Sequence, residues 1–255
     1  MARGMTYEFA HYTRYLWTSR GLVVVLADAR PLVPLRESYM RRYGIDTPYN
    51  ADVYARFDTF MAAVGLAAVS LVDREYWGWS VNFPGETEGF FVAAEAEGLL
   101  CGRIRETPKE GCGAVVQRQK AGEQGTQSFF EPNNSDPVET VQTYFEVAMQ
   151  TTTRMAVPTL EHAVLVQALP HGKMDDLWAL DNEALVAAVQ GALATGELEQ
   201  IEEVVLFYEC RCTPELIDEK LRLLPSEQFD EIWNEHGTAM VECPRCGRNF
   251  KLTKN

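Results

Sequence analysis

Four cysteines near the C-terminus constrain the structure of this chain more than any other feature. They form two closely spaced pairs separated by thirty residues, Cys210-Arg211-Cys212 and Cys243-Pro244-Arg245-Cys246. Zinc prefers four soft ligands at tetrahedral corners, and two cysteine pairs on separate turns can supply them. Gly247 allows the backbone to curl toward the sulfurs. The pattern predicts one zinc site with the ligands Cys210, Cys212, Cys243 and Cys246. The alternative, core cysteines without metal, leaves their pairing unexplained.

The predicted site is structural or regulatory. Four thiolates leave no coordination position open for a substrate, so we expect neither zinc catalysis nor an enzyme. Cys101 and Cys112 lie outside both pairs, and we interpret them as buried, small apolar thiols. The basic residues near the pairs either offset the charge of a tetrathiolate centre, lower the thiol pKa values, or are solvated surface charges; they are Arg211, Arg245, Arg248 and Lys251.

Length and charge limit the classes of protein. With 255 residues, 46% of them apolar, the chain can form one ordinary domain and a small satellite. The formal net charge is −14, and residues 171–255 hold 17 Asp and Glu against 8 Lys and Arg. A nucleic-acid partner is therefore not expected. The longest weakly polar run, Met61–Val72, is shorter than the roughly 18 residues of a membrane-spanning helix.

We find no basic-then-apolar signal sequence after Met1 and therefore expect a cytoplasmic protein without a membrane partner. Cysteines kept in a reducing compartment are more often bound to metal or redox-active than joined in structural disulfides. This expectation agrees with the zinc site.

Residues 1–170 are predicted to form an α+β domain with a largely antiparallel sheet and packed helices. Gly21–Leu26 is a β-branched run that predicts a buried strand, and Ala51–Leu71 has apolar residues at helical spacing. Asp136 can cap a helix that starts at Pro137, with Glu139 completing a capping box. Further strands are expected at Trp77–Phe83, Gly89–Ala94, Leu99–Arg105, Ala114–Arg118, Thr153–Val157 and His162–Leu169.

Residues 171–204 are predicted to form a metastable helical linker. The apolar positions are Leu177, Leu180, Leu185, Val189 and Leu193. Gly191 and Gly196 each weaken a helix by about 1 kcal/mol. The apolar face must pack against the N-terminal domain or the metal domain. A stable pair of helices integral to the fold is an equally open interpretation.

Residues 205–255 are predicted to form a small zinc domain. A strand at Glu203–Tyr208 leads to the first cysteine pair, Thr213 and Ser226 cap two helices, and Gly237 ends the second. About fifty residues with few apolar side chains form too small a core to fold without a disulfide, metal or partner. Zinc bound to cysteines contributes roughly 10–16 kcal/mol of folding free energy. Because a disulfide removes two ligands, an oxidant can release the zinc and unfold this domain.

The cysteine segments resemble those of the HslO family, the 33 kDa redox-regulated heat-shock holdase chaperones. The resemblance lies mainly in Tyr208-Glu209-Cys210-Arg211-Cys212 and Cys243-Pro244-Arg245-Cys246-Gly247. It continues, in order along the chain, at Arg14–Leu16, Arg20–Val23, Asp136–Phe145 and Val164–Pro170.

This resemblance implies an ATP-independent holdase that is inactive while reduced and zinc-bound. Oxidation would form the disulfides Cys210–Cys212 and Cys243–Cys246, release zinc, and unfold the zinc domain and linker. The exposed apolar surface would capture unfolding or oxidatively damaged client proteins, and the active form would be a homodimer. We expect the uncovered face to include Trp178, Leu180, Leu185 and Val189. The competing hypothesis is a zinc-ribbon adaptor whose static zinc site docks another protein.

Overall fold

The computed structural model describes residues 9–46, 48–71, 75–107 and 112–254. A ten-stranded sheet forms its centre, in the order β7-β6-β3-β4-β5-β10-β1-β2-β9-β8. Neighbouring strands pair antiparallel except β5 and β10, which are parallel over two residue pairs. The strands are β1 Ala10–Trp17, β2 Leu22–Asp28, β3 Tyr76–Asn82, β4 Glu88–Ala94, β5 Leu99–Glu106, β6 Gly113–Gln119, β7 Thr126–Phe130, β8 Thr153–Thr159, β9 His162–Ala168 and β10 Glu199–Tyr208. The predicted α+β class and largely antiparallel sheet are confirmed.

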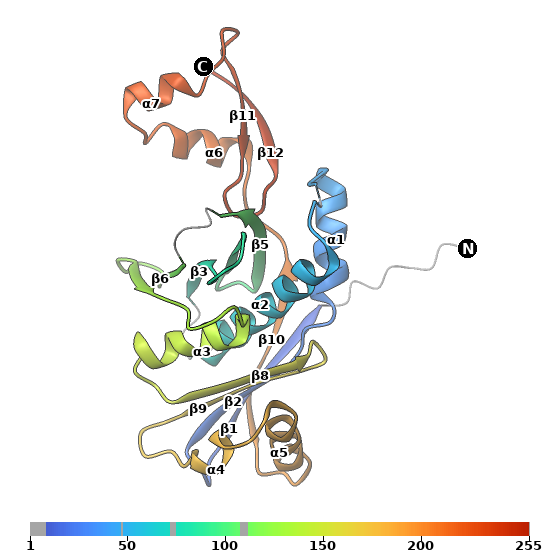
Figure 1. Ribbon diagram of the computed structural model, residues 1–255. Coiled ribbons are helices and arrows are strands. Elements are labelled where there is room, and N and C mark those ends of the chain that lie inside the picture. The colour runs from blue at the N-terminus through green and yellow to red at the C-terminus, as the bar shows by residue number, and fades with distance from the viewer. Residues whose placement is uncertain (1–8, 47, 72–74, 108–111, 255) are drawn as a thin grey trace, which may run out of the picture.

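The helices cover this sheet at different places (Figure 1). They are α1 Leu32–Tyr43, α2 Ala51–Ser70, α3 Pro137–Val147, α4 Asp175–Trp178, α5 Asn182–Ala194, α6 Pro214–Leu221 and α7 Ser226–Glu231. A separate hairpin, β11 Thr238–Glu242 and β12 Asn249–Thr253, lies at one end of the molecule with α6 and α7, whereas α4 and α5 lie at the other end. The cysteine-bearing unit and the predicted linker helices are thus far apart.

Helix α2 is the centre of the main core. Asn50 caps it by accepting a 3.0 Å hydrogen bond from the Val53 amide. A Cβ atom added at Gly65 would lie 2.5 Å from the Tyr12 hydroxyl oxygen, so only glycine allows α2 to approach β1 this closely. The helix is long and apolar enough to cross a membrane, but 72% of its most apolar window is buried in the protein. We therefore interpret α2 as a core helix of the folded protein, although its length and composition would also suit a membrane-spanning helix.

A second apolar cluster lies beneath α4 and α5. Leu185 and Val189 of α5 are fully buried against β2, β8 and β9, together with Val164 and Val166. The predicted apolar face of the linker therefore packs on the sheet of the N-terminal region. The prediction that Trp178 and Leu193 belong to this buried face is wrong, because Trp178 is 43% exposed and Leu193 is 39% exposed.

The glycines of this segment have different roles. Gly191 lies inside α5, whereas Gly196 follows the end of α5 with φ of +76° and allows the turn into β10. The expectation that Gly196 weakens the helix is therefore wrong. Strand β10 itself spans residue 204, the predicted boundary between linker and zinc domain, and it lies between β5 and β1. The division into 1–170, 171–204 and 205–255 stays a prediction.

The structure contains five elements that the sequence patterns did not reveal: β1, α1, β7, β11 and β12. In β1 a buried arginine, Arg14, occupies a position where alternation requires an apolar residue. In α1 the buried Arg36 forms an ion pair with Asp58 of α2 at 2.7 Å. Charged residues at core positions thus concealed the periodicity of β1 and α1.

Helix caps were predicted with mixed success. Asp136 accepts from the amides of Val138 and Glu139 as expected. The capping box is wrong, because Asn134 rather than Glu139 accepts from the Asp136 amide. Thr213 caps α6 through the Leu216 amide. The Ser226 cap is also wrong, because Pro225 occupies the N-cap position of α7, and α7 ends at Glu231 before Gly237.

Candidate metal centre

Two loops carry the four cysteines of the predicted zinc site. Strand β10 ends at Tyr208 and leads directly to Cys210 and Cys212, and the turn between β11 and β12 carries Cys243 and Cys246. In this turn the Cys243 amide donates to the Arg248 carbonyl at 2.8 Å, and the Gly247 amide donates to the Cys243 carbonyl at 3.0 Å. Gly247 has φ of +80°, the left-handed conformation that glycine favours. The predicted curl of the backbone is therefore present.

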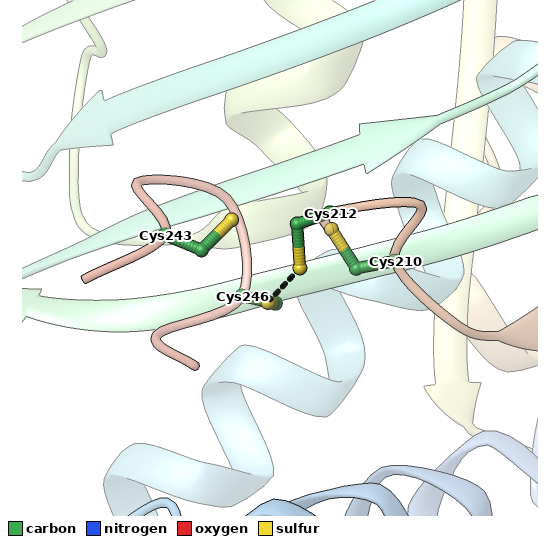
Figure 2. A group of neighbouring side chains, drawn as sticks. All are labelled: Cys210, Cys212, Cys243 and Cys246. Atoms are coloured by element: carbon green, nitrogen blue, oxygen red, sulfur yellow. Dashed lines mark hydrogen bonds between the residues drawn. The ribbon is translucent and has the colours of Figure 1, made fainter. Parts of the chain in front are cut away.

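The four side chains point toward one another (Figure 2). Their sulfur atoms all lie within 4.8 Å of one another, and each cysteine is buried. One contact joins the two loops directly, with 3.5 Å between the sulfurs of Cys212 and Cys246. Zinc–sulfur bonds at tetrahedral corners would place sulfurs about 3.8 Å apart. The cluster can therefore hold a metal ion, and its soft donors fit zinc.

The four sulfurs of the cluster affect one another's pKa values. Hydrogen bonds with Cys210, then with Cys212 and Cys246, lower the pKa of Cys243. Hydrogen bonding with Cys210 is also the main cause that raises the pKa values of Cys212 and Cys246. The pKa values of neighbouring sulfurs are thus shifted in opposite directions, as expected for acidic groups that titrate together in one buried site. All four sulfurs can ionise together only if a cation neutralises them.

A tyrosine that the sequence did not reveal contacts this cluster. The hydroxyl of Tyr39, in α1, donates a hydrogen bond to the Cys246 sulfur across 3.3 Å. Burial, and then this hydrogen bond, raise the pKa of Tyr39, so the hydroxyl keeps its proton and remains a donor. A hydrogen bond of this kind orients a metal-binding sulfur from outside the ligand set. Tyr39 lies 207 residues from Cys246, so local sequence carries no signal for the pair.

Arginines join the cysteine-bearing loops and their hairpin to the core. The Arg211 Nε lies 2.9 Å from Glu95, and Arg245 pairs with the same carboxylate. Arg103 of β5 pairs with Glu242 at 2.6 Å. Arg248 lies over the ring of Tyr43, 3.9 Å from its centroid. Arg245, mostly buried and paired, is therefore not a solvated surface charge, whereas Arg211 keeps 45% of its side chain exposed despite its ion pair.

The remaining two cysteines differ from each other. Cys101, in β5, is buried as predicted, and its interaction with the Cys210 thiol is the largest cause raising the pKa of Cys210 to about 12. Cys112 is exposed, so the prediction that it is buried is wrong. It precedes the first residue of β6, where the chain has not yet entered the sheet.

Comparisons with known proteins give one consistent result. The family model described as Hsp33 protein matches residues 47–253. The fold is similar to the crystal structure of the 33 kDa chaperonin, a heat shock protein 33 homolog, from Thermotoga maritima, with a TM-score of 0.65 at 14% sequence identity. The alignment covers 96% of this chain and 95% of that one. No curated protein matches the chain significantly.

Proposed function

Because this chain belongs to the Hsp33 family, we propose that it is an ATP-independent holdase that is silent while reduced and active once its cysteine cluster is oxidised. Family membership makes it a chaperone of the Hsp33 type. The observation that most supports redox control is the gathering of four buried thiols from two loops. Such a site binds metal tightly in one redox state only. We expect a chaperone and not an enzyme.

In the reduced protein, Cys210, Cys212, Cys243 and Cys246 would hold zinc. Bound zinc supplies folding free energy to the cysteine-bearing unit, roughly 10–16 kcal/mol for such sites. A peroxide or hypochlorite would take two electrons from each pair of thiolates, which would then join in an S–S bond in place of binding the metal. With protons from solvent, peroxide would leave as water, and hypochlorite as chloride and water. We assign the bridges to Cys210–Cys212 and Cys243–Cys246. Each bridge removes two ligands, so the two loops separate.

Helices α4 and α5 would provide the surface that binds clients. They cover the sheet face formed by Trp17, Leu22, Val24, Ala156, Val164 and Val166. Polar contacts add to this packing: Arg20 pairs with Asp176 at 2.7 Å, and Arg154 donates to Asn182 at 2.8 Å. Separating α4 and α5 from the sheet would expose both the apolar face of these helices and the apolar face of the sheet. Leu185 and Val189 belong to the proposed client surface, whereas Trp178 is already 43% exposed.

Strand β10 is the element that can connect oxidation with this surface. It runs from Glu199, close after α5, to Tyr208, just before Cys210. Its cysteine end is held to β5 by hydrogen bonds from the amides of Phe207 and Glu209 to the carbonyls of Gly98 and Leu100, at 2.9 and 3.0 Å. Along the rest of its length β10 pairs with β1. Loosening its last residues would shorten this strand toward α5.

The partners follow from the same proposal. Unfolding or oxidatively damaged proteins are the clients, and a second copy of the chain joins it in the oxidised, active form. The net charge of −14 makes nucleic acid an unfavourable partner. We place the protein in the cytoplasm, where thiols stay reduced until oxidative stress, and we expect no membrane partner.

The proposal is tested by aggregation of a chemically unfolded client protein, followed by light scattering. Zinc-loaded reduced protein is compared with protein treated with hypochlorite or warm peroxide, and zinc release is measured in the same samples. We expect suppression only after oxidation, in step with zinc loss and reversed by a thiol reductant. Zinc loss without suppression contradicts the holdase. Retention of zinc under oxidant, with equal partner binding in both states, supports the adaptor.

A further inference from the structure

A single carboxylate contacts both cysteine loops. Glu95 follows β4 directly, in the hairpin between β4 and β5, and its side chain is only 9% exposed. One carboxylate oxygen lies 2.9 Å from Nε of Arg211, the residue between Cys210 and Cys212. The other oxygen accepts from Arg245, which lies between Cys243 and Cys246. Both cysteine loops thus meet the core at the same side chain.

The two contacts depend on each other because the loops come from different parts of the chain. Arg211 and Arg245 can reach Glu95 together only while both loops are folded around the sulfur cluster. If one loop moves away, Glu95 loses one of its two arginine partners while its carboxylate stays mostly buried beside the other arginine. Removing one partner of such a buried charge costs more folding free energy than breaking an ion pair that is exposed to solvent.

The hairpin that carries Glu95 also holds the end of β10. The Glu95 amide donates to the Leu99 carbonyl at 2.8 Å, which closes the hairpin, and the Gly98 carbonyl accepts from Phe207 at 2.9 Å. A Cβ at Gly98 would lie 2.6 Å from the Val205 carbonyl, so the hairpin packs tightly on β10. Glu95 therefore lies where both cysteine loops and the last residues of β10 meet the core.

We propose that Glu95 is a positioning residue of the cysteine cluster: it fastens both loops to the core and so limits how often the buried thiols open to an oxidant. Reaction of a buried group requires local opening, and its rate follows the population of the open form. The purpose of this fastening rests on the proposed redox switch. The fastening itself does not, because it concerns only how the loops dock.

The chain provides a matched control for this carboxylate. Glu97, in the same hairpin, also pairs with Arg211, but its side chain is 62% exposed and it does not contact Arg245 in the described structure. Exposed ion pairs contribute little to stability. Glu95→Gln removes the charge of the shared carboxylate with almost no change of shape, and Glu97→Gln removes a neighbouring charge that binds one loop only.

The experiment measures zinc release from the zinc-loaded, full-length protein at a fixed peroxide concentration, using a chromogenic chelator. Amide exchange of residues 210–213 and 243–248 is measured on the same samples. We expect Glu95→Gln to bind one zinc per chain and to release it about tenfold faster than the original protein, the factor that corresponds to about 1.4 kcal/mol. Exchange in both loops should rise together, while exchange in β1 and β2 stays unchanged. Glu97→Gln should match the original protein.

Arginine variants keep the test decisive if Glu95→Gln folds poorly. Arg211→Gln and Arg245→Gln should each loosen both loops, and adding Glu95→Gln to the double arginine variant should give no further increase. Equal zinc-release rates and equal exchange in Glu95→Gln and Glu97→Gln would overturn the proposal, as would full additivity of the three changes. These readouts need no client, so failure of the holdase assay and failure of this proposal are separate results.

Discussion

The two ends of this molecule, α4 and α5 at one and the cysteine-bearing unit at the other, are held to the sheet by different kinds of interaction. Helices α4 and α5, which we call the linker helices, bury Leu177, Leu185 and Val189 against an apolar sheet face. Residues 209–254, which we call the zinc unit, bury Ile217, Phe250 and Leu252 besides the cysteines and Ala239, and their polar contacts with the core include those to Tyr39, Glu95 and Arg103. Apolar burial is insensitive to oxidants, whereas a thiolate cluster is not. Redox sensitivity is thus expected to begin in the zinc unit.

A redox switch in this molecule must carry the effect of oxidation from one end of the molecule to the other. The linker helices and the zinc unit lie at opposite ends of the molecule, joined by β10 (Figure 1). Oxidation cannot act on the linker helices directly. It can act on them only by changing β10 or the sheet, so a change made in one part shows whether the other part responds.

The largest effect is expected from removing one cysteine of the cluster. Cys243→Ser removes a soft ligand, so the zinc unit should lose its metal and most of the roughly 10–16 kcal/mol that zinc contributes. Hydrogen exchange should become fast across 209–254 and remain slow in β2, β8 and β9. Cys112→Ser, which changes an exposed thiol, is the control. Slow exchange in the zinc unit of the Cys243→Ser variant would show that the unit folds without metal.

Oxidised protein should reveal which sulfurs join. We expect Cys210–Cys212 and Cys243–Cys246, detected by mass spectrometry of peptides cut between the loops. In the reduced structure the sulfurs of Cys212 and Cys246 lie 3.5 Å apart across the two loops. A Cys212–Cys246 bridge would therefore mean that the disulfide forms before the loops separate. That outcome contradicts the assigned pairing.

A cavity beneath the linker helices should activate the protein without involving zinc. Leu185 is fully buried, and Leu185→Ala at such a site costs about 2–5 kcal/mol. We expect the reduced, zinc-loaded variant to suppress client aggregation in part. Leu193→Ala, on the same helix at a 39% exposed position, should remain silent. If both variants stay silent while α5 exchanges rapidly, the client surface lies elsewhere.

The Tyr39 hydroxyl should have a smaller effect, confined to the zinc unit. Tyr39→Phe keeps the ring and removes the hydrogen bond to the Cys246 sulfur, a loss of about 1 kcal/mol. Zinc stoichiometry should be unchanged, and zinc release under peroxide should become several-fold faster. Tyr43→Phe, one turn further along α1, is the matched control. Identical release rates for the two variants would show that the hydrogen bond does not protect the cluster.

The smallest effect is expected at the start of α4, from a solvent-exposed ion pair. The hydrogen bond from Arg20 lowers the pKa of Asp176. A lowered pKa in the folded state stabilises above the ordinary pKa of aspartate, and this contribution disappears as the pH falls through the lowered value. Asp176→Asn should therefore speed amide exchange in α4 slightly at neutral pH, relative to the original protein, and not in acid. A difference that persists in acid would point to a cause other than this charge.

Much of the fold could be predicted because its signals are local. The β-branched run of β2 and the Ala-rich α2 showed clear periodicity, and Asp136 and Thr213 are standard capping residues. Strand β1 and helix α1 were missed because their buried positions include Arg14 and Arg36. Both arginines are compensated by partners distant in sequence, Glu202 for Arg14 and Asp58 for Arg36. Such pairs leave no periodic pattern.

The sequence by itself determined the donor set of the cluster, since the spacing of two cysteine pairs and the conformation of Gly247 are properties of short segments. Only the tertiary structure decided what surrounds that set. Tyr39 and Glu95 reach the cysteine loops across 207 and 150 residues, and β10 enters the centre of the sheet because β1 and β5 provide its partners. Ligand spacing is encoded locally, whereas docking depends on which distant groups the folded sheet brings within hydrogen-bonding distance.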